Sequence, residues 1–125
     1  RRPQPRKVED LDHHHLVAFG APTATHLLYD LNSLLTLGRD PKNPREPQIS
    51  VNNLAAMTRA VENGVGIAVL PDYVVTPESG LVRLLPQADM PEMDCFLVYA
   101  EELKAVARVQ AFRDFLVRTA QRWRY

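Results

Sequence analysis

Three adjacent histidines are the first residues of this chain whose type could support metal chemistry. His13, His14 and His15 are consecutive, so on a helix they cannot share one face, and on a strand only His13 and His15 would. No cysteine or carboxylate stands at a zinc-like spacing around them, and His26 is isolated. The pattern favours a partly exposed helix end, and we predict no metal site.

The sequence Gly64-Val65-Gly66 has the composition of a phosphate-binding loop but not its context. Such loops follow a strand and open a helix. Here the glycines follow an expected helix and precede an expected strand. We interpret them as a tight helix-to-strand turn, in which Gly66 allows two backbone segments to approach closely.

The remaining candidates for catalysis are weak. Cys95 borders the apolar residues 96–99, whereas a reactive thiolate needs a positive or polar setting and a nearby base. A core cysteine is therefore the better interpretation, and Glu101-Glu102 is better interpreted as a solvated turn than as an acid/base pair. No Gly-x-Ser-x-Gly nucleophile motif occurs. We predict that the protein is not an enzyme, has no catalytic residue and needs no cofactor.

Composition and charge narrow the class of protein further. The 125 residues suffice for one core, and 15 basic and 15 acidic side chains give a formal net charge of zero. This balance argues against nucleic-acid binding by these residues alone, because phosphate neutralisation needs a basic excess. No apolar run approaches the roughly 20 residues of a membrane helix, and residues 1–12 lack the apolar region of a signal peptide. One cysteine suits a reducing compartment, so we expect a cytoplasmic protein that contacts no membrane.

The elements that must position a site are organised around residues 51–71. Asn52 or Asn53 can cap a helix, since the side-chain oxygen accepts from the free amides of a first turn. The apolar face of this helix is formed by Leu54, Met57 and Val61. Asn-Gly at residues 63–64 ends it, and the apolar residues 67–70 predict a buried parallel strand.

Other elements follow from hydrophobic patterns and turn residues. We expect a short helix at residues 8–14, a loop at 38–47, a single turn at 72–75 and a helix from about residue 104. Further strands are expected at residues 16–19, 48–51, 81–85 and 95–99. Thr23 or Thr25 could cap a helix that runs to Leu37, although residues 27–31 could instead form a short strand. Strands alternating with helices predict an α/β fold with about five strands.

These motifs, taken in order, resemble the effector-binding domain of LysR-type transcriptional regulators. A helix leads through Gly64-Val65-Gly66 into Ile-Ala-Val-Leu-Pro at residues 67–71. Gly-Leu-Val-Arg-Leu-Leu-Pro follows at residues 80–86, and Arg-Val-Gln-Ala-Phe-Arg-Asp-Phe-Leu at residues 108–116 is similar to the closing helix of that family. Upstream, Glu9-Asp10-Leu11 and His14 precede residues 16–17 in the same manner. The resemblance covers nearly the whole chain.

The resemblance implies a periplasmic-binding-protein-like effector subdomain with an additional C-terminal helix. Residues 8–102 would form the second α/β subdomain of the effector domain, and residues 103–125 the closing helix. The winged helix-turn-helix and the first subdomain have no counterpart in these 125 residues, so the sequence reads as a fragment, and DNA contact would come only through the missing N-terminal domain.

The resemblance also implies a cleft that binds a small effector, such as an organic acid. Carried onto this chain, the ligand-binding candidates are Ala21, Pro22 and Thr23, after the strand that ends at Gly20, and Asn52, Asn53 and Leu54, at the start of the central helix. Free amides at a helix N-terminus attract carboxylates. Asn52 or Asn53 could equally be only a cap, and Thr23 only a turn residue.

The expected C-terminal helix carries an apolar stripe. It consists of Val106, Val109, Phe112, Leu116 and Trp123, flanked by Phe115 and Ala120. In the family this stripe would pack on the first subdomain. Without that subdomain we predict a homo-oligomer, a dimer formed through this helix, because closed two-fold dimers are the commonest solution for soluble chains.

The predicted function is that of the effector-sensing, oligomerising part of a LysR-type transcriptional regulator. It would act by ligand-biased rearrangement of an oligomer rather than by catalysis. The alternative is a fragment of a periplasmic-type solute-binding protein, which shares the architecture and would need a signal peptide upstream.

Overall fold

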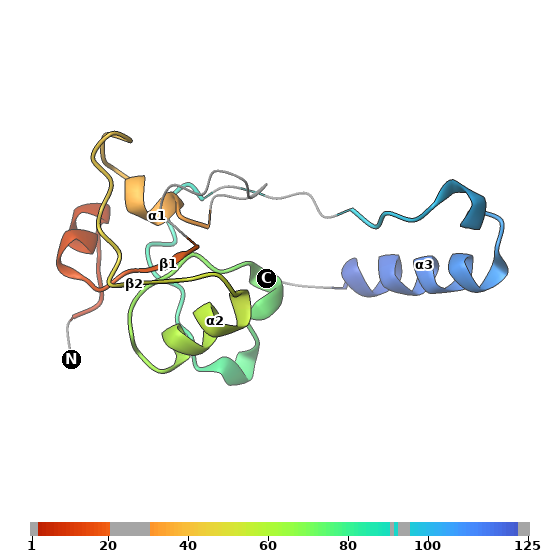
Figure 1. The fold of residues 1–125 in the computed structure, drawn as a ribbon. Coiled ribbons are helices and arrows are strands. Elements are labelled where there is room, and N and C mark those ends of the chain that lie inside the picture. Colours follow the sequence, from red (N-terminus) through yellow and green to blue (C-terminus); the bar gives the residue numbers. More distant parts are fainter. Residues whose placement is uncertain (1–2, 21–30, 91, 93–95, 123–125) are drawn as a thin grey trace. The chain divides into compact units, whose positions relative to one another are not determined.

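The computed structural model describes residues 3–20, 31–90, 92 and 96–122 of the chain. The chain divides into two compact units, Arg1–Pro91 and Glu92–Tyr125, whose elements are drawn in Figure 1. No helix among the described residues combines the length and the apolar character needed to cross a membrane.

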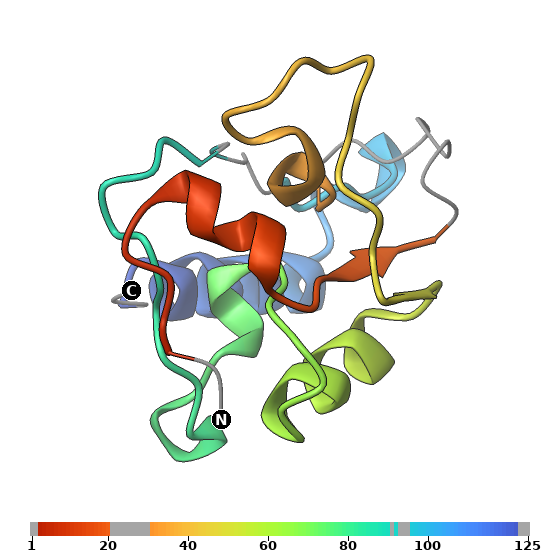
Figure 2. The ribbon, with the colours of Figure 1, turned by 90° about the vertical axis from the view of Figure 1, so that its left-hand side faces the viewer.

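The first unit is built around a short parallel sheet. β1 (Val17–Phe19) pairs with β2 (Ile49–Val51), and one further parallel bridge joins Leu16 to Ile67. The described residues of this unit also form two α-helices, α1 (Ser33–Thr36) and α2 (Leu54–Glu62), and three 3₁₀ helices, η1 (Val8–His13), η2 (Asp72–Val74) and η3 (Pro77–Ser79). Figures 1 and 2 show α1 and α2 on opposite sides of the strands.

The core of this unit lies between η1, β1 and α1. Its buried side chains are Leu11, Leu16, Ala18, Leu34, Leu35 and Leu85. On the other side of the strands, α2 packs against β1 and β2, and its Met57 side chain is completely buried. β1 is thus covered on both faces, which explains why it is apolar rather than alternating, whereas Ile49 and Ser50 of β2 are exposed.

The predicted helix α2 and the turn that follows it are confirmed, whereas the predicted strand after the turn is not. Asn53 is the N-cap, and its Oδ1 accepts from the Ala56 N–H at 3.1 Å. Gly64 follows the helix with a φ of 73°, a left-handed conformation that glycine adopts without strain. A Cβ on Gly66 would overlap the backbone carbonyl of His15, so the predicted close approach of two backbone segments is confirmed.

Arg45 is a buried charged residue that the sequence did not reveal. Its side chain is 4% exposed and lies in the predicted loop of residues 38–47. Its Nε donates to Asp12 Oδ1 at 2.6 Å. Its two Nη groups donate to three backbone carbonyls, those of Leu34 at 3.1 Å, Leu37 at 2.7 Å and Val8 at 3.3 Å. Arg45 therefore joins the loop to both η1 and α1.

The predicted strand count is not confirmed, because the described residues form two strands rather than about five. Of residues 67–70 only Ile67 makes a bridge. Residues 81–85 are irregular, and Leu85 has a φ of 50° and accepts from the Ala88 N–H at 2.8 Å in a turn. Leu84 and Leu85 still pack on the core. Their apolar character therefore reflects burial, whereas a strand also requires a neighbouring backbone to pair with.

The helix predicted from Thr23 or Thr25 to Leu37 is seen only in part. Residues 21–30 lie outside the described residues, and α1 covers only Ser33–Thr36. Asn32 precedes α1 and pairs with β1 instead of capping the helix. Its Oδ1 accepts from the Phe19 N–H at 2.8 Å, and its Nδ2 donates to the Phe19 carbonyl at 2.9 Å.

The described part of the second unit consists of an irregular segment and a helix. Residues 96–100 show no strand pairing and are followed by η4 (Glu101–Leu103) and α3 (Ala107–Ala120). The predicted strand at residues 95–99 is therefore wrong where described, since this unit offers no second described strand. The helix starts later than predicted because Val106 is still extended.

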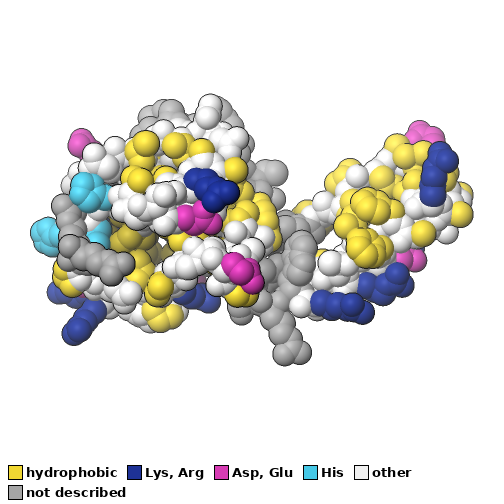
Figure 3. All heavy atoms as spheres, turned by 90° about the horizontal axis from the view of Figure 1, so that it is seen from below, with side chains coloured by type: hydrophobic (Ala, Val, Ile, Leu, Met, Phe, Trp, Pro, Cys, Tyr) yellow, Lys and Arg dark blue, Asp and Glu magenta, His cyan; other side chains and the backbone are white. Residues whose placement is uncertain are grey.

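The second unit exposes large apolar side chains. Phe96 is 80% exposed, Phe112 58% and Phe115 55%, and Figure 3 shows hydrophobic side chains gathered over its surface. Arg113 has a raised pKa, first because of its hydrogen bond to the Asp114 carboxylate and second because of its hydrogen bond to Tyr99. These contacts join α3 to the irregular segment but leave both phenylalanines of the helix in solvent.

Candidate functional site

The candidate site lies where the two parallel strands end. The Gly20 N–H donates to the Val51 carbonyl at 2.6 Å, so the end of β1 lies beside the end of β2. Gly20 leads into the predicted binding residues Ala21, Pro22 and Thr23, which are outside the described residues. Val51 leads into Asn52, Asn53 and Leu54. In open α/β sheets, ligands bind at the carboxyl ends of strands, and both predicted segments start from that edge.

The N-terminus of α2 presents polar groups to solvent at this edge. Asn52 and Asn53 are exposed and Leu54 is partly buried. Asn53 uses its Oδ1 as the helix cap, which leaves the Nδ2 group of the same side chain able to donate to a ligand. The structure thus assigns the capping role to Asn53, and Asn52 is the asparagine that does not cap.

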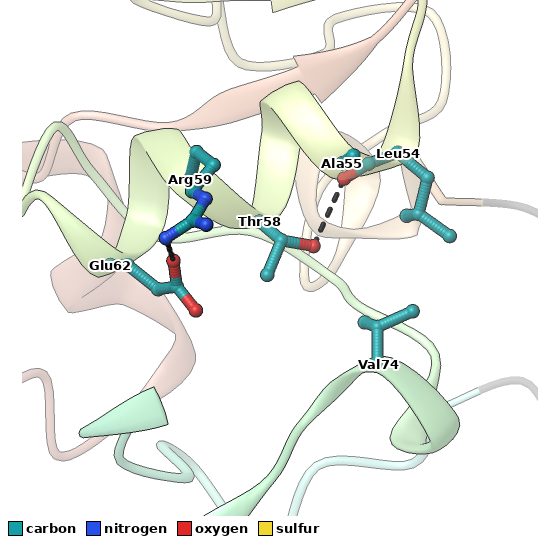
Figure 4. A pocket seen from close by; sticks show the side chains of 6 residues that line it. All are labelled: Leu54, Ala55, Thr58, Arg59, Glu62 and Val74. Carbon is teal, nitrogen blue, oxygen red and sulfur yellow. Dashed lines mark hydrogen bonds and ion pairs between the residues drawn. The ribbon is translucent and has the colours of Figure 1, made fainter. Parts of the chain in front are cut away.

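A pocket of about 480 Å³ lies along one side of α2. Figure 4 shows its lining: Leu54, Ala55, Thr58, Arg59, Glu62 and, from η2, Val74. The Thr58 hydroxyl donates to the Leu54 carbonyl at 2.9 Å, and Arg59 pairs with Glu62 at 3.3 Å. The Thr58 hydroxyl and one Nη group of Arg59 are therefore engaged within the protein. Of the predicted binding residues, Leu54 is the one that lines it.

A second hollow, of about 210 Å³, is lined mainly by charged residues. Asp12, Arg39, Arg45 and Glu46 line it together with His14. The hydrogen bond from Arg39 and then that from Arg45 hold the pKa of Asp12 below its ordinary value. Because Asp12 pairs with both arginines, at 2.9 Å and 2.6 Å, we assign this cluster a structural role.

The rings of His14 and His15 contact protein atoms. His14 Nδ1 lies 2.7 Å from the Asp10 carbonyl and Nε2 lies 2.8 Å from the Pro3 carbonyl. His15 Nδ1 lies 2.7 Å from Gln48 Oε1. Within the described part of the chain, no group of three or more His, Cys, Asp or Glu side chains could hold a metal ion.

Sequence reasoning missed two residues that organise the site. Asn32 fixes the end of β1 through both polar groups of Phe19, and Arg45 fixes the loop before β2. Asn32 gave no signal, because the predicted helix from Thr23 or Thr25 to Leu37 placed it in a helix interior. Arg45 gave none, because its acceptors come from segments distant in the sequence.

Comparison with known proteins defines the class of protein. The model of the LysR substrate-binding domain family matches residues 1–121. The chain therefore belongs to the LysR substrate-binding domain family, and the resemblance noted from its motifs is confirmed.

The comparison also gives one named relative. This is the HTH-type transcriptional regulator PtxR of Pseudomonas aeruginosa, 35% identical over 72 residues, which are 55% of this chain and 23% of that protein. The match thus spans less than a quarter of the relative. No solved structure matches the chain. The family implies a periplasmic-binding-protein-like α/β fold, and the mixed helices and parallel sheet of the first unit fit it.

Proposed function

We propose that these residues are the effector-sensing part of a LysR-type transcriptional regulator, which acts in the cytoplasm. The observation that carries the proposal is the family match over residues 1–121. Binding of a small organic ligand would favour one arrangement of the regulator over another, since a ligand shifts an equilibrium by its differential affinity for the two states. DNA contact would belong to a different part of the regulator, and no chemical reaction would be catalysed.

The ligand would bind at the shared edge of β1 and β2. The candidates remain Ala21, Pro22 and Thr23 on one side and Asn52, Asn53 and Leu54 on the other. Two features support this proposal: a hydrogen bond joins Gly20 to Val51, the described residues that precede the two segments in the sequence, and α2 begins after Val51 with exposed asparagines. A carboxylate would accept from the free amides of the first turn of α2.

An effector-dependent reporter assay with a regulator that carries this domain tests the proposal. Replacing Asn52 by Ala should shift the response to higher effector concentration, while the unbound reporter level stays the same. Asn63→Ala is the matched control, because Asn63 lies at the other end of the same helix and donates only to the Arg59 carbonyl. An unchanged response in Asn52→Ala, or an equal loss in Asn63→Ala, would remove the N-terminus of α2 from the site.

We further propose that α3 takes part in self-association. The division of residues 8–102 as the second subdomain and 103–125 as the closing helix belongs to the same proposal. Phe112 and Phe115 are more than half exposed, and burying a large apolar side chain contributes roughly 1.5–3 kcal/mol. A second copy of the chain could cover them. The proposal commits to a homodimer through this helix.

A further inference from the structure

The His14 ring lies between two groups that can only accept hydrogen bonds. Nδ1 is 2.7 Å from the Asp10 carbonyl oxygen, and Nε2 is 2.8 Å from the Pro3 carbonyl oxygen. A neutral imidazole carries a single N–H, so it can donate to one of these carbonyls and must point a lone pair at the other. The imidazolium form donates to both. The observed geometry is therefore complete only when the ring is protonated.

The His14 contacts attach residues 3–7, the N-terminal segment, to η1. Asp10 Oδ2 accepts from the Arg6 N–H at 2.9 Å and from the Lys7 N–H at 3.2 Å. Gln87 Nε2 donates to the Arg6 carbonyl at 3.2 Å. Pro3, at the start of the segment, is held by His14. The segment thus has a carboxylate contact near its end and an imidazole contact near its beginning.

We propose that His14 is a proton-controlled clasp, whose imidazolium holds Pro3 against η1 and whose neutral form releases it. A proton from solvent binds Nε2 when the clasp closes and returns to solvent when it opens. The neutral ring keeps the bond to Asp10, because that carbonyl lies within the same helical segment and closer to the ring. This inference goes beyond effector sensing and does not depend on it.

The charged groups around His14 carry no net charge that would oppose its imidazolium form. Four charged side chains line the smaller hollow together with His14. Arg39, Arg45 and Glu46 come from the loop of residues 38–47, and Asp12 comes from η1. Two positive and two negative charges balance there, so the hollow does not itself oppose an imidazolium. Asp12 pairs with both arginines.

Asp10 is a further charged group near His14, as is Lys7, and Asp10 stays ionised over the range of about pH 5 to 8 in which an ordinary histidine changes charge. The Arg6 N–H, opposed by partial desolvation and assisted by the Lys7 N–H, holds the pKa of Asp10 below its ordinary value of 3.8. Its bonds to the segment are therefore present throughout the range of about pH 5 to 8, where an ordinary histidine changes charge. The described side chains that hold the N-terminal segment are Asp10, Gln87 and His14, and His14 is the histidine among them.

Nuclear magnetic resonance of the whole chain over a pH series tests the clasp. Imidazole nitrogen shifts report how many ring nitrogens of His14 carry a proton, and the Gln4, Arg6 and Lys7 amides report the state of the segment. As the clasp opens, the Gln4 amide signal should move, because its nitrogen belongs to the same peptide group as the Pro3 carbonyl that His14 holds. The Arg6 and Lys7 amides, held by Asp10, should change less.

Two variants separate the clasp from a general effect of pH. His14→Gln should abolish the pH-dependent step at Gln4 and leave the segment loosened at every pH. His15→Gln, which replaces the neighbouring histidine bound to Gln48, should keep the step. A Gln4 signal that ignores the titration of His14, or a step that disappears in His15→Gln instead, would overturn the proposal.

Discussion

Replacing the buried Arg45 should destabilise the first unit, because its side chain joins three segments of the chain. In Arg45→Ala, three backbone carbonyls, those of Val8, Leu34 and Leu37, lose their donor. A hydrogen bond from a charged group contributes about 1.5–3 kcal/mol and a neutral one about 1 kcal/mol. We count the ion pair to Asp12 as a small addition, because the Asp12 side chain is 33% exposed and solvent screens it.

Removing one partner of a buried charge pair costs about 3–5 kcal/mol, less than the sum of three separate bonds from a charged group, and we expect a loss of that size in the free energy of unfolding. This is a large share of the roughly 5–15 kcal/mol that stabilises a typical domain. Arg45→Lys should lose nearly as much, because one ammonium cannot reproduce the planar fork that reaches four acceptors. Arg39→Ala is the matched control: Arg39 pairs with the same Asp12 but is 31% exposed, so its loss should be within about 1 kcal/mol.

The assay is urea unfolding followed through the methyl signals of the core leucines Leu11 and Leu35, which report the first unit alone. The free energy of unfolding should also depend on pH. The pKa of Asp12 is lowered in the folded state. Its ion pairs therefore stabilise the unit when the pH is above the unfolded pKa of about 3.9, and this stabilisation is lost as the pH falls through the lower folded pKa. This acid-dependent part should become smaller in Arg45→Ala and smaller still in Arg39→Ala, because the hydrogen bond from Arg39 is the larger cause of the lowered pKa. A loss below about 1 kcal/mol in Arg45→Ala, or equal losses in Arg45→Ala and Arg39→Ala, would refute the role given to Arg45.

Three further outcomes follow from the structure. Gly66→Ala should destabilise the first unit by about 1–3 kcal/mol, as overpacking does, because the added Cβ meets the His15 carbonyl; an unchanged thermal midpoint would contradict this close approach. Light scattering after size exclusion should show a species larger than 14.2 kDa. The double variant Phe112→Asp, Leu116→Asp should convert this species to a monomer. A parent chain that is itself a stable monomer would exclude self-association through α3. Fluorescence anisotropy at physiological salt should detect no sequence-dependent DNA binding at sub-micromolar concentration, since the net charge is zero; such binding would place DNA recognition within these residues.

The part of the fold that sequence predicted well depends on local signals. The start and end of α2 follow from Asn53 and from residues 63–64, which act on backbone groups within one turn. Gly66 was also readable, because two glycines after a helix indicate a tight connection. β1 and β2 were predicted correctly as strands at residues 16–19 and 48–51.

The part that could not be predicted depends on distant neighbours. Residues 81–85 and 96–99 have the apolar composition of strands, yet composition reports burial and not backbone pairing. Leu85 is buried from an irregular turn. Arg45 looks like a loop charge until the carbonyls of η1 and α1 are placed around it. For the candidate site, the sequence predicted the helix N-terminus that the structure shows at Asn53 and Leu54, but not which asparagine caps the helix.

The most direct test of the central claim is to map a bound ligand on the nitrogen-labelled chain by nuclear magnetic resonance. Small aromatic and aliphatic acids are titrated while the backbone amide signals are recorded. We expect one class of acid to shift the amides from Asn52 to Ala56, with weak affinity, because these residues alone would enclose only one side of a ligand and pockets normally enclose most of it. Shifts confined to α3 or to the pocket beside Val74, or tight binding that leaves the N-terminus of α2 unchanged, would contradict the claim that the ends of β1 and β2 form the effector site.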